Sequence, residues 1–223
     1  MESHSGLENR NAPGQIAAWG AALAAAFVVS LPQPARADEV TPPPVPFNIE
    51  VPAGNKAFLV GHAYGTQNYI CLPSASSPTG FAYSLFTPQA TLFDDDFEQV
   101  INHFFSPNPS ENGVVRATWE DSRDTSMFWG FVEPPTPSNP LGHTSTDPHF
   151  VARGAVAWVL LTKGGVLDGP SGGDRLSQTT YVQRLNTAGG VAPATGCASP
   201  SDIGNKQFVP YRADYFFFKA SGR

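Results

Sequence analysis

Six aromatic and polar side chains, spread over several segments of the chain, are of the types that bind a sugar or a small polar ligand. Aromatic faces stack on such a ligand, and amide or guanidinium groups donate hydrogen bonds to it. The candidates are Gln67, Tyr69, Trp119, Trp129, Gln183 and Arg184. The tryptophans could instead be core residues, and the Gln–Arg pair could tie down a buried loop. Because Gln183 and Arg184 are adjacent in a predicted strand, at most one of them faces a given pocket.

A second candidate group lies in one long predicted loop and consists of His143, Asp147 and His149. Imidazole nitrogens and a carboxylate are suitable ligands for a divalent transition metal. A metal-dependent hydrolase centred on this loop is therefore an alternative hypothesis. The spacing matches no established zinc motif, so we assign no metal and no other cofactor. His62 and His103 lie in predicted strands and could act as general bases only if a nucleophile approaches them in the fold.

Other recognisable chemistry is missing from the sequence. There is no paired-carboxylate motif and no Gly-rich loop in phosphate-binding order. Residues 169–173 (GPSGG) match the letters of the G-x-S-x-G pattern, but they lie in a Gly-rich stretch that we interpret as a flexible hairpin connection, not as a nucleophile elbow. The formal net charge is −6, and no block of Lys and Arg is present. Nucleic-acid binding requires clustered basic residues that neutralise phosphates, so we expect no nucleic-acid partner. We therefore expect a binding protein rather than an enzyme.

The N-terminal segment has the pattern of an export signal. Residues 16–30 form an apolar run after Arg10, and Ala35-Arg36-Ala37 supplies the small-x-small pattern that a signal peptidase recognises. We expect a signal peptide over 1–37, cleavage after Ala37 and a periplasmic or secreted mature chain without a membrane span. The alternative is a retained anchor, although the run is short for crossing a bilayer.

The chain contains only two cysteines, Cys71 and Cys197. In an oxidising compartment two cysteines most simply form one disulfide. This bridge would close a loop of about 126 residues, which the chain-entropy model values at roughly 5 kcal/mol.

Sparse charge, 21 Gly and 22 Pro favour short strands joined by tight turns. After a Pro-rich lead-in at 38–46, we expect a single β-rich domain over 47–220 with a turn at Gly65. Residues 94–104 fit either a helix or a hairpin, and the strand-like surroundings favour the hairpin. The fold class is all-β, an antiparallel sandwich or a Greek-key barrel with little helix and one disulfide. The expected strands are 57–62, 67–71, 81–86, 90–93, 100–105, 114–119, 126–132, 155–162, 178–186 and 208–218.

Several of these segments together resemble the domain of unknown function 3455 family, which occurs in secreted bacterial and fungal proteins. The resemblance implies an exported domain with the two cysteines paired and no established biochemical activity. The matching stretches are 65–71 (GTQNYIC), 103–104 (HF), 118–119 (TW), 126–130 (SMFWG), 157–161 (AWVLL), 180–190 (TYVQRLNTAGG), 192–193 (AP), Cys197 and 211–217 (YRADYFF).

These observations lead to one main hypothesis, an uncharacterised, non-enzymatic β-scaffold that binds a small polar ligand or a glycan in the cell envelope or the secreted fraction. Besides the hydrolase, a structural or interaction protein of the envelope is the remaining alternative, and the identity of any partner stays open.

Overall fold

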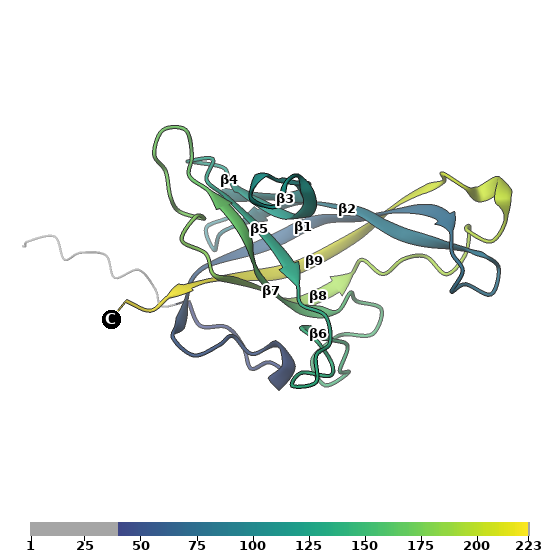
Figure 1. Ribbon diagram of the computed structural model, residues 1–223, viewed down its shortest axis with the longest axis horizontal. Coiled ribbons are helices and arrows are strands. Elements are labelled where there is room, and N and C mark those ends of the chain that lie inside the picture. The colour runs from purple at the N-terminus through teal and green to yellow at the C-terminus, as the bar shows by residue number, and fades with distance from the viewer. Residues whose placement is uncertain (1–39, 223) are drawn as a thin grey trace, which may run out of the picture. The chain divides into compact units, whose positions relative to one another are not determined.

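The computed structural model describes residues 40–222, which form nine antiparallel strands and three single-turn 3-10 helices (Figure 1). The predicted signal peptide and its cleavage point lie outside the described residues. Within 40–222, no helix is long and apolar enough to cross a membrane. The elements are η1 (Phe47–Ile49), β1 (Asn55–Pro73), β2 (Phe81–Phe93), β3 (Gln99–Asn108), η2 (Pro109–Glu111), β4 (Val114–Asp121), β5 (Met127–Val132), β6 (Thr144–Ser145), β7 (Trp158–Leu167), β8 (Tyr181–Gly189), η3 (Pro200–Asp202) and β9 (Lys206–Ala220).

The sheet closes into a barrel of eight strands. Its order is β5-β4-β3-β2-β1-β9-β8-β7, the pairing of β5 with β7 closes the ring, and β6 adds a short strand beside β7. The predicted all-β antiparallel fold is confirmed, and of the two architectures the barrel is the one that forms. The Greek-key order is wrong, because barrel neighbours follow one another along the chain. Short connections join β1 to β5 in sequence, whereas longer loops link β5 to β9. Closure removes the free edges that a sandwich would retain.

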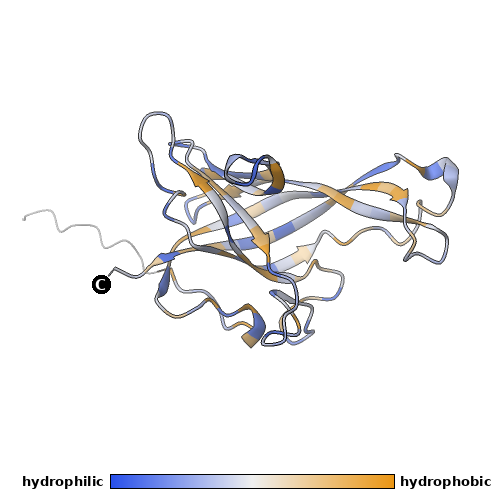
Figure 2. Ribbon diagram, viewed as in Figure 1, coloured by the Kyte–Doolittle hydropathy of each residue, from blue (hydrophilic) through white to orange (hydrophobic). Residues whose placement is uncertain are grey.

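Strand alternation separates the barrel interior from its outer surface. Along β9, Tyr211, Ala213, Tyr215 and Phe217 point into the interior core, whereas Phe216 packs in a second cluster outside the barrel, as the sequence pattern predicts. Figure 2 shows hydrophobic residues concentrated on the strands and hydrophilic residues on the loops. The barrel wall therefore carries two apolar faces at β9.

The second cluster covers the outside of β7 and β8. On β7, Val159 and Leu161 face the interior core, while Trp158 and Leu160 pack outside against Ile49 of η1. The apolar run around residue 158 is therefore a strand that is covered on both faces. The Pro-rich lead-in takes part in this packing, since Val40 and Val45 contact the same cluster.

The turn expected at Gly65 is wrong, because the predicted strands 57–62 and 67–71 are one continuous strand, β1. Gly65 pairs with Ala90 on one side and Tyr211 on the other. A Cβ atom at this position would lie 2.0 Å from the backbone oxygen of Gln89. Glycine is needed here because the backbones of β1 and β2 approach each other closely. A glycine inside a strand can therefore mark such a close approach rather than a turn.

The predicted strands 81–86 and 90–93 are likewise one continuous strand, β2, whereas two other local predictions are confirmed. Residues 94–98 form the turn of a hairpin between β2 and β3, not the start of a helix. Cys71 and Cys197 form a disulfide with their Cα atoms 5.5 Å apart. β1, β2 and β9 extend past the barrel as an arm, and the bridge fastens the β8–β9 connection to it (Figure 1).

Candidate functional site: a pocket inside the barrel

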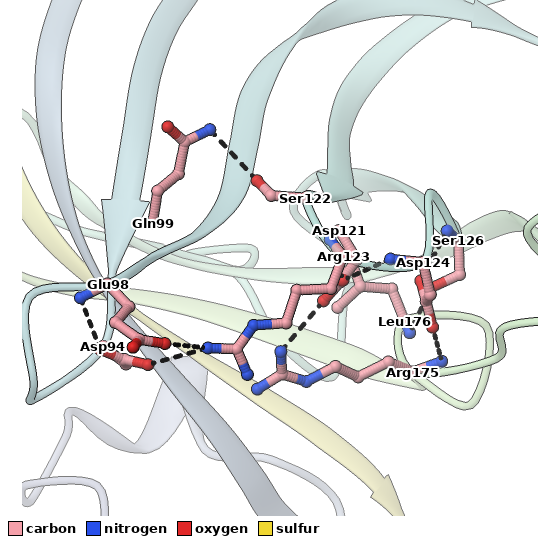
Figure 3. Close-up of polar contacts among 10 residues, drawn as sticks. All are labelled: Asp94, Glu98, Gln99, Asp121, Ser122, Arg123, Asp124, Ser126, Arg175 and Leu176. Atoms are coloured by element: carbon pink, nitrogen blue, oxygen red, sulfur yellow. Dashed lines mark hydrogen bonds and ion pairs between the residues drawn. The ribbon is translucent and has the colours of Figure 1, made fainter.

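One end of the barrel is closed by the connection between β7 and β8. The side chain of Leu176 from this connection is completely buried in the interior core, and its backbone N–H donates to Ser126 Oγ at 2.9 Å. Arg175 beside it donates from Nη1 to Asp121 Oδ2 at 3.2 Å and from its backbone N–H to Asp124 Oδ2 at 3.1 Å (Figure 3). A polar network thus holds an apolar plug in place, and we call this the closed end.

The opposite end contains a pocket of about 290 Å³ inside the barrel. Its size lies at the lower limit of small-molecule sites, and most of its lining is apolar. Its rim includes Leu85, Val115 and Val132, which are 41%, 57% and 36% exposed. The complete lining is Gln67, Leu85, Pro88, His103, Phe105, Val115, Arg116, Ala117, Trp119, Gly130, Phe131, Val132, Val159, Leu161, Arg184 and Tyr215.

The inner wall of the pocket is an aromatic stack around His103. Its ring lies parallel to that of Trp119 with centroids 4.3 Å apart, and Tyr215 is 5.1 Å away. The backbone carbonyl of Thr118 can only accept, so His103 Nδ1–H donates to it at 2.8 Å and Nε2 remains an acceptor. Burial, together with the positive charge of Arg184, lowers the pKa of His103 to about 3, although the hydrogen bond to Thr118 opposes this shift. The imidazole is therefore neutral at ordinary pH.

Arg184 brings a positive charge to this pocket. Its Nε and Nη2 both donate to the carbonyl of Ala157, at 3.2 and 2.9 Å, which fixes the guanidinium plane. None of the ion pairs within residues 40–222 includes Arg184. Burial raises the pKa of the neighbouring Tyr215 hydroxyl, and Arg184 partly offsets that rise. The guanidinium of Arg184 thus lowers the pKa values of His103 and Tyr215, and no carboxylate in the described residues pairs with it.

The other cation in the lining, Arg116, is neutralised within the protein. It donates from Nη2 to Glu111 Oε1 at 2.7 Å, and its guanidinium carbon lies 4.9 Å from the ring centroid of Phe131. Hydrogen bonds from Arg116 and Asn108 lower the pKa of Glu111 to about 2. Arg184 is therefore the cation of the pocket that lacks a counter-charge.

Two further donors in the pocket wall lack acceptors. Gln67 and Trp119 are 2% and 0% exposed, and within the described chain Gln67 Nε2 and Trp119 Nε1 have no hydrogen-bond partner. A buried donor without an acceptor costs about 1–3 kcal/mol, so such groups often mark a place where another molecule supplies the acceptor. Both atoms are almost completely shielded from solvent, so they lie behind the pocket surface rather than on it.

Three of the six predicted binding residues line the pocket, namely Gln67, Trp119 and Arg184. The other three make hydrogen bonds within the protein: Tyr69 Oη donates to Gly190 O at 2.6 Å, Trp129 Nε1 to Ser106 Oγ at 2.9 Å, and Gln183 Nε2 to Ile49 O at 2.7 Å. The expectation that Gln183 and Arg184 face opposite ways agrees with these contacts.

The positions of His103 and Tyr215 in the pocket wall could not be predicted from the sequence. His103 stands out there only as an isolated histidine in a predicted strand, and Tyr215 only as one aromatic residue of the predicted strand 208–218. The alternation along their strands places both side chains inside a barrel. It does not distinguish a packed interior position from one beside a cavity.

The candidate metal loop does not gather its three residues. His149 Nδ1 pairs with Asp147 Oδ1 at 2.8 Å on the surface, whereas Nδ1 of His143 is buried without a partner. Within 40–222, no group of three or more His, Cys, Asp or Glu side chains could hold a metal ion. The hydrolase alternative therefore lacks the ligand set on which it was based.

Together, fold and pocket define the class: a closed β-barrel whose strands follow chain order and whose interior holds a ligand-sized pocket. The family model described as "Protein of unknown function (DUF3455)" matches residues 52–219, a range that covers β1 to β8 completely and β9 up to Lys219. The chain belongs to this family, which confirms the resemblance seen in the sequence. No curated protein and no solved structure matches it.

Proposed function

We propose that this chain is a non-enzymatic binding protein of the cell envelope or the secreted fraction that holds one small molecule inside its barrel. The single observation that supports this most strongly is the interior pocket of about 290 Å³, which is open at one end, is lined mostly by apolar side chains and contains Arg184, a cation in none of the described ion pairs. A closed barrel offers a rigid wall for such a site. The disulfide fits an oxidising compartment, where such bridges persist.

The chemistry of the pocket favours binding over catalysis. A general base at neutral pH requires a pKa near the working pH, whereas the pKa of His103 is about 3. Its Nδ1–H is also committed to a backbone carbonyl. A ligand with an apolar part suits the exposed aliphatic rim better than a glycan does.

The test is a fragment screen by ligand-observed NMR with two matched variants. Val115 and Val114 are adjacent exposed residues of β4, and only Val115 lines the pocket. Val115→Trp should narrow the mouth and abolish binding of the fragments that the wild-type protein takes up. Val114→Trp, on the other face of the same strand, should leave that binding intact. A screen without binders, or binders that tolerate Val115→Trp, would contradict the proposal.

A further inference from the structure

We propose that the ligand is a small carboxylic acid, with its carboxylate against Arg184 and its apolar body towards the rim. This inference rests on the proposed function, because it names the ligand class for the same pocket. It depends on the balance of charge in the pocket, on the donors around Arg184 and on the change of polarity from wall to rim.

The balance of charge requires an anion. The pocket lining contains two arginines and neither Asp nor Glu. Glu111 outside the lining neutralises Arg116, which leaves Arg184 without a counter-charge among the described ion pairs. A partly buried cation without a partner is costly, and a ligand anion that enters the pocket relieves that cost. A neutral ligand would leave it unrelieved.

The donors around Arg184 suit an acceptor-only group. Its guanidinium has five N–H groups, of which the Ala157 carbonyl takes one from Nε and one from Nη2. Those bonds hold the guanidinium in one plane, so the remaining N–H groups are already oriented. An ionised carboxylate has two oxygens that accept and no donor, which matches this set.

A single free cation also favours a carboxylate over a phosphate. A phosphate group carries nearly two negative charges at neutral pH and is usually bound by several basic groups. Here the pocket offers one guanidinium that is not already paired. One carboxylate neutralises it without leaving excess negative charge in the barrel.

Polarity changes along the pocket in a way that orients such a ligand. The wall residues Trp119 and Tyr215 are 0% and 1% exposed, whereas the rim residue Val115 is 57% exposed. An acid that inserts its carboxylate first pairs with Arg184 and covers the exposed aliphatic rim with its hydrocarbon part. Short aryl-alkyl acids combine these features at the size that about 290 Å³ allows.

The decisive experiment compares two molecules of the same shape. Binding of 3-phenylpropionate and of its uncharged amide, 3-phenylpropanamide, to the wild-type protein is measured by calorimetry at neutral pH. We expect the acid to bind about tenfold or more tightly, because a charge-assisted hydrogen bond contributes about that factor. An amide that binds as tightly as the acid, or no binding of either, would overturn the inference.

Two variants link that preference to Arg184. Arg184→Met should remove the advantage of the acid over the amide, and Arg184→Lys should restore part of it. The matched control is Arg212→Met, which removes an exposed strand arginine on the outer face of β9 and should leave the ratio within about twofold. If Arg184→Met does not fold, the acid–amide ratio of the wild-type protein and its decrease with salt still decide.

The outcome also separates the two levels of the proposal. Suppose that neutral fragments bind, that Val115→Trp abolishes their binding, and that the acid binds no more tightly than the amide. This result would support a binding site inside the barrel and would refute a carboxylate as its ligand. A screen without any binder would refute both.

Discussion

The two ends of the barrel use arginine in opposite ways. At the closed end, Arg175 pairs with the fully buried carboxylate of Asp121, which also accepts two backbone N–H groups (Figure 3). At the pocket end, Arg184 meets a carbonyl but no carboxylate. A buried charge whose partners all lie within the protein stabilises the fold. A buried charge without a counter-charge can be neutralised by a bound ligand, and this difference is the reason why we propose the ligand site at the pocket end.

The largest effect should come from breaking the closed end with Asp121→Ala. Removing this carboxylate leaves two backbone N–H groups and Arg175 without their acceptor, so we expect a loss of about 3–5 kcal/mol in the free energy of unfolding. Urea denaturation measures it. Glu98→Ala is the control at the same end, because its exposed ion pair with Arg123 should contribute less than about 1 kcal/mol. Equal losses in the two variants would show that burial of the Asp121 pair is unimportant.

The free energy of unfolding should depend strongly on pH because of His103 in the pocket wall. Burial lowers the pKa of His103 to about 3, below its usual 6.5, so the unfolded chain binds a proton that the folded protein does not. Stability therefore falls as the pH drops from about 6 to 4, by about 1.4 kcal/mol per pH unit for this group. His103→Phe should remove that part of the slope. Parallel curves of unfolding free energy against pH for the two proteins would contradict the buried neutral imidazole.

Much of the fold was predictable because it follows local pattern. The alternation along β9 predicts which face of this strand is interior. The four side chains on that face all lie in the interior core, namely Tyr211, Ala213, Tyr215 and Phe217. The error at Gly65 has a non-local cause. Its conformation depends on the backbone of Gln89 on the neighbouring strand, which no local turn propensity encodes.

The candidate site could be predicted only in part, because residue type does not determine whether a side chain faces the pocket or packs against the rest of the protein. Trp119 and Trp129 look equivalent in sequence, yet one lines the pocket and the other donates to Ser106 in the protein. A shift in register between Trp129 and Gly130 interrupts the alternation of β5. Arg184 was a candidate by type, but the absence of a carboxylate around it follows from barrel closure rather than from spacing.

Arg184→Met tests the comparison from the pocket end. The substitution removes two hydrogen bonds to Ala157 but also a charge without a carboxylate partner, and the two effects oppose each other. We expect the free energy of unfolding to stay within about 1 kcal/mol of the wild-type value, far from the loss at Asp121. Denaturation under the conditions used for Asp121→Ala makes the comparison direct. A loss as large as that at Asp121 would show that Arg184 serves the fold.

The smallest effect concerns His62 on the outside of β1, which should respond to pH in the opposite direction to His103. Its Nδ1 lies 2.7 Å from Asp214 and its Nε2 lies 3.0 Å from Asp95 in the β2–β3 turn. Burial alone would lower its pKa, but the hydrogen bonds with Asp214 and Asp95 outweigh burial and raise it.

A raised pKa in the folded protein means that the stabilisation by His62 is complete below about pH 6.5 and disappears as the pH rises through the higher folded value. His62→Asn should therefore cost more at pH ~5.5 than at pH ~8.5, by less than about 1 kcal/mol because solvent screens this partly exposed group. Asp95→Asn should reproduce part of the effect by removing one of the two carboxylates. A cost that is the same at both pH values would show that the contacts of His62 act through packing, and the contrast between the two histidines would then rest on His103 alone.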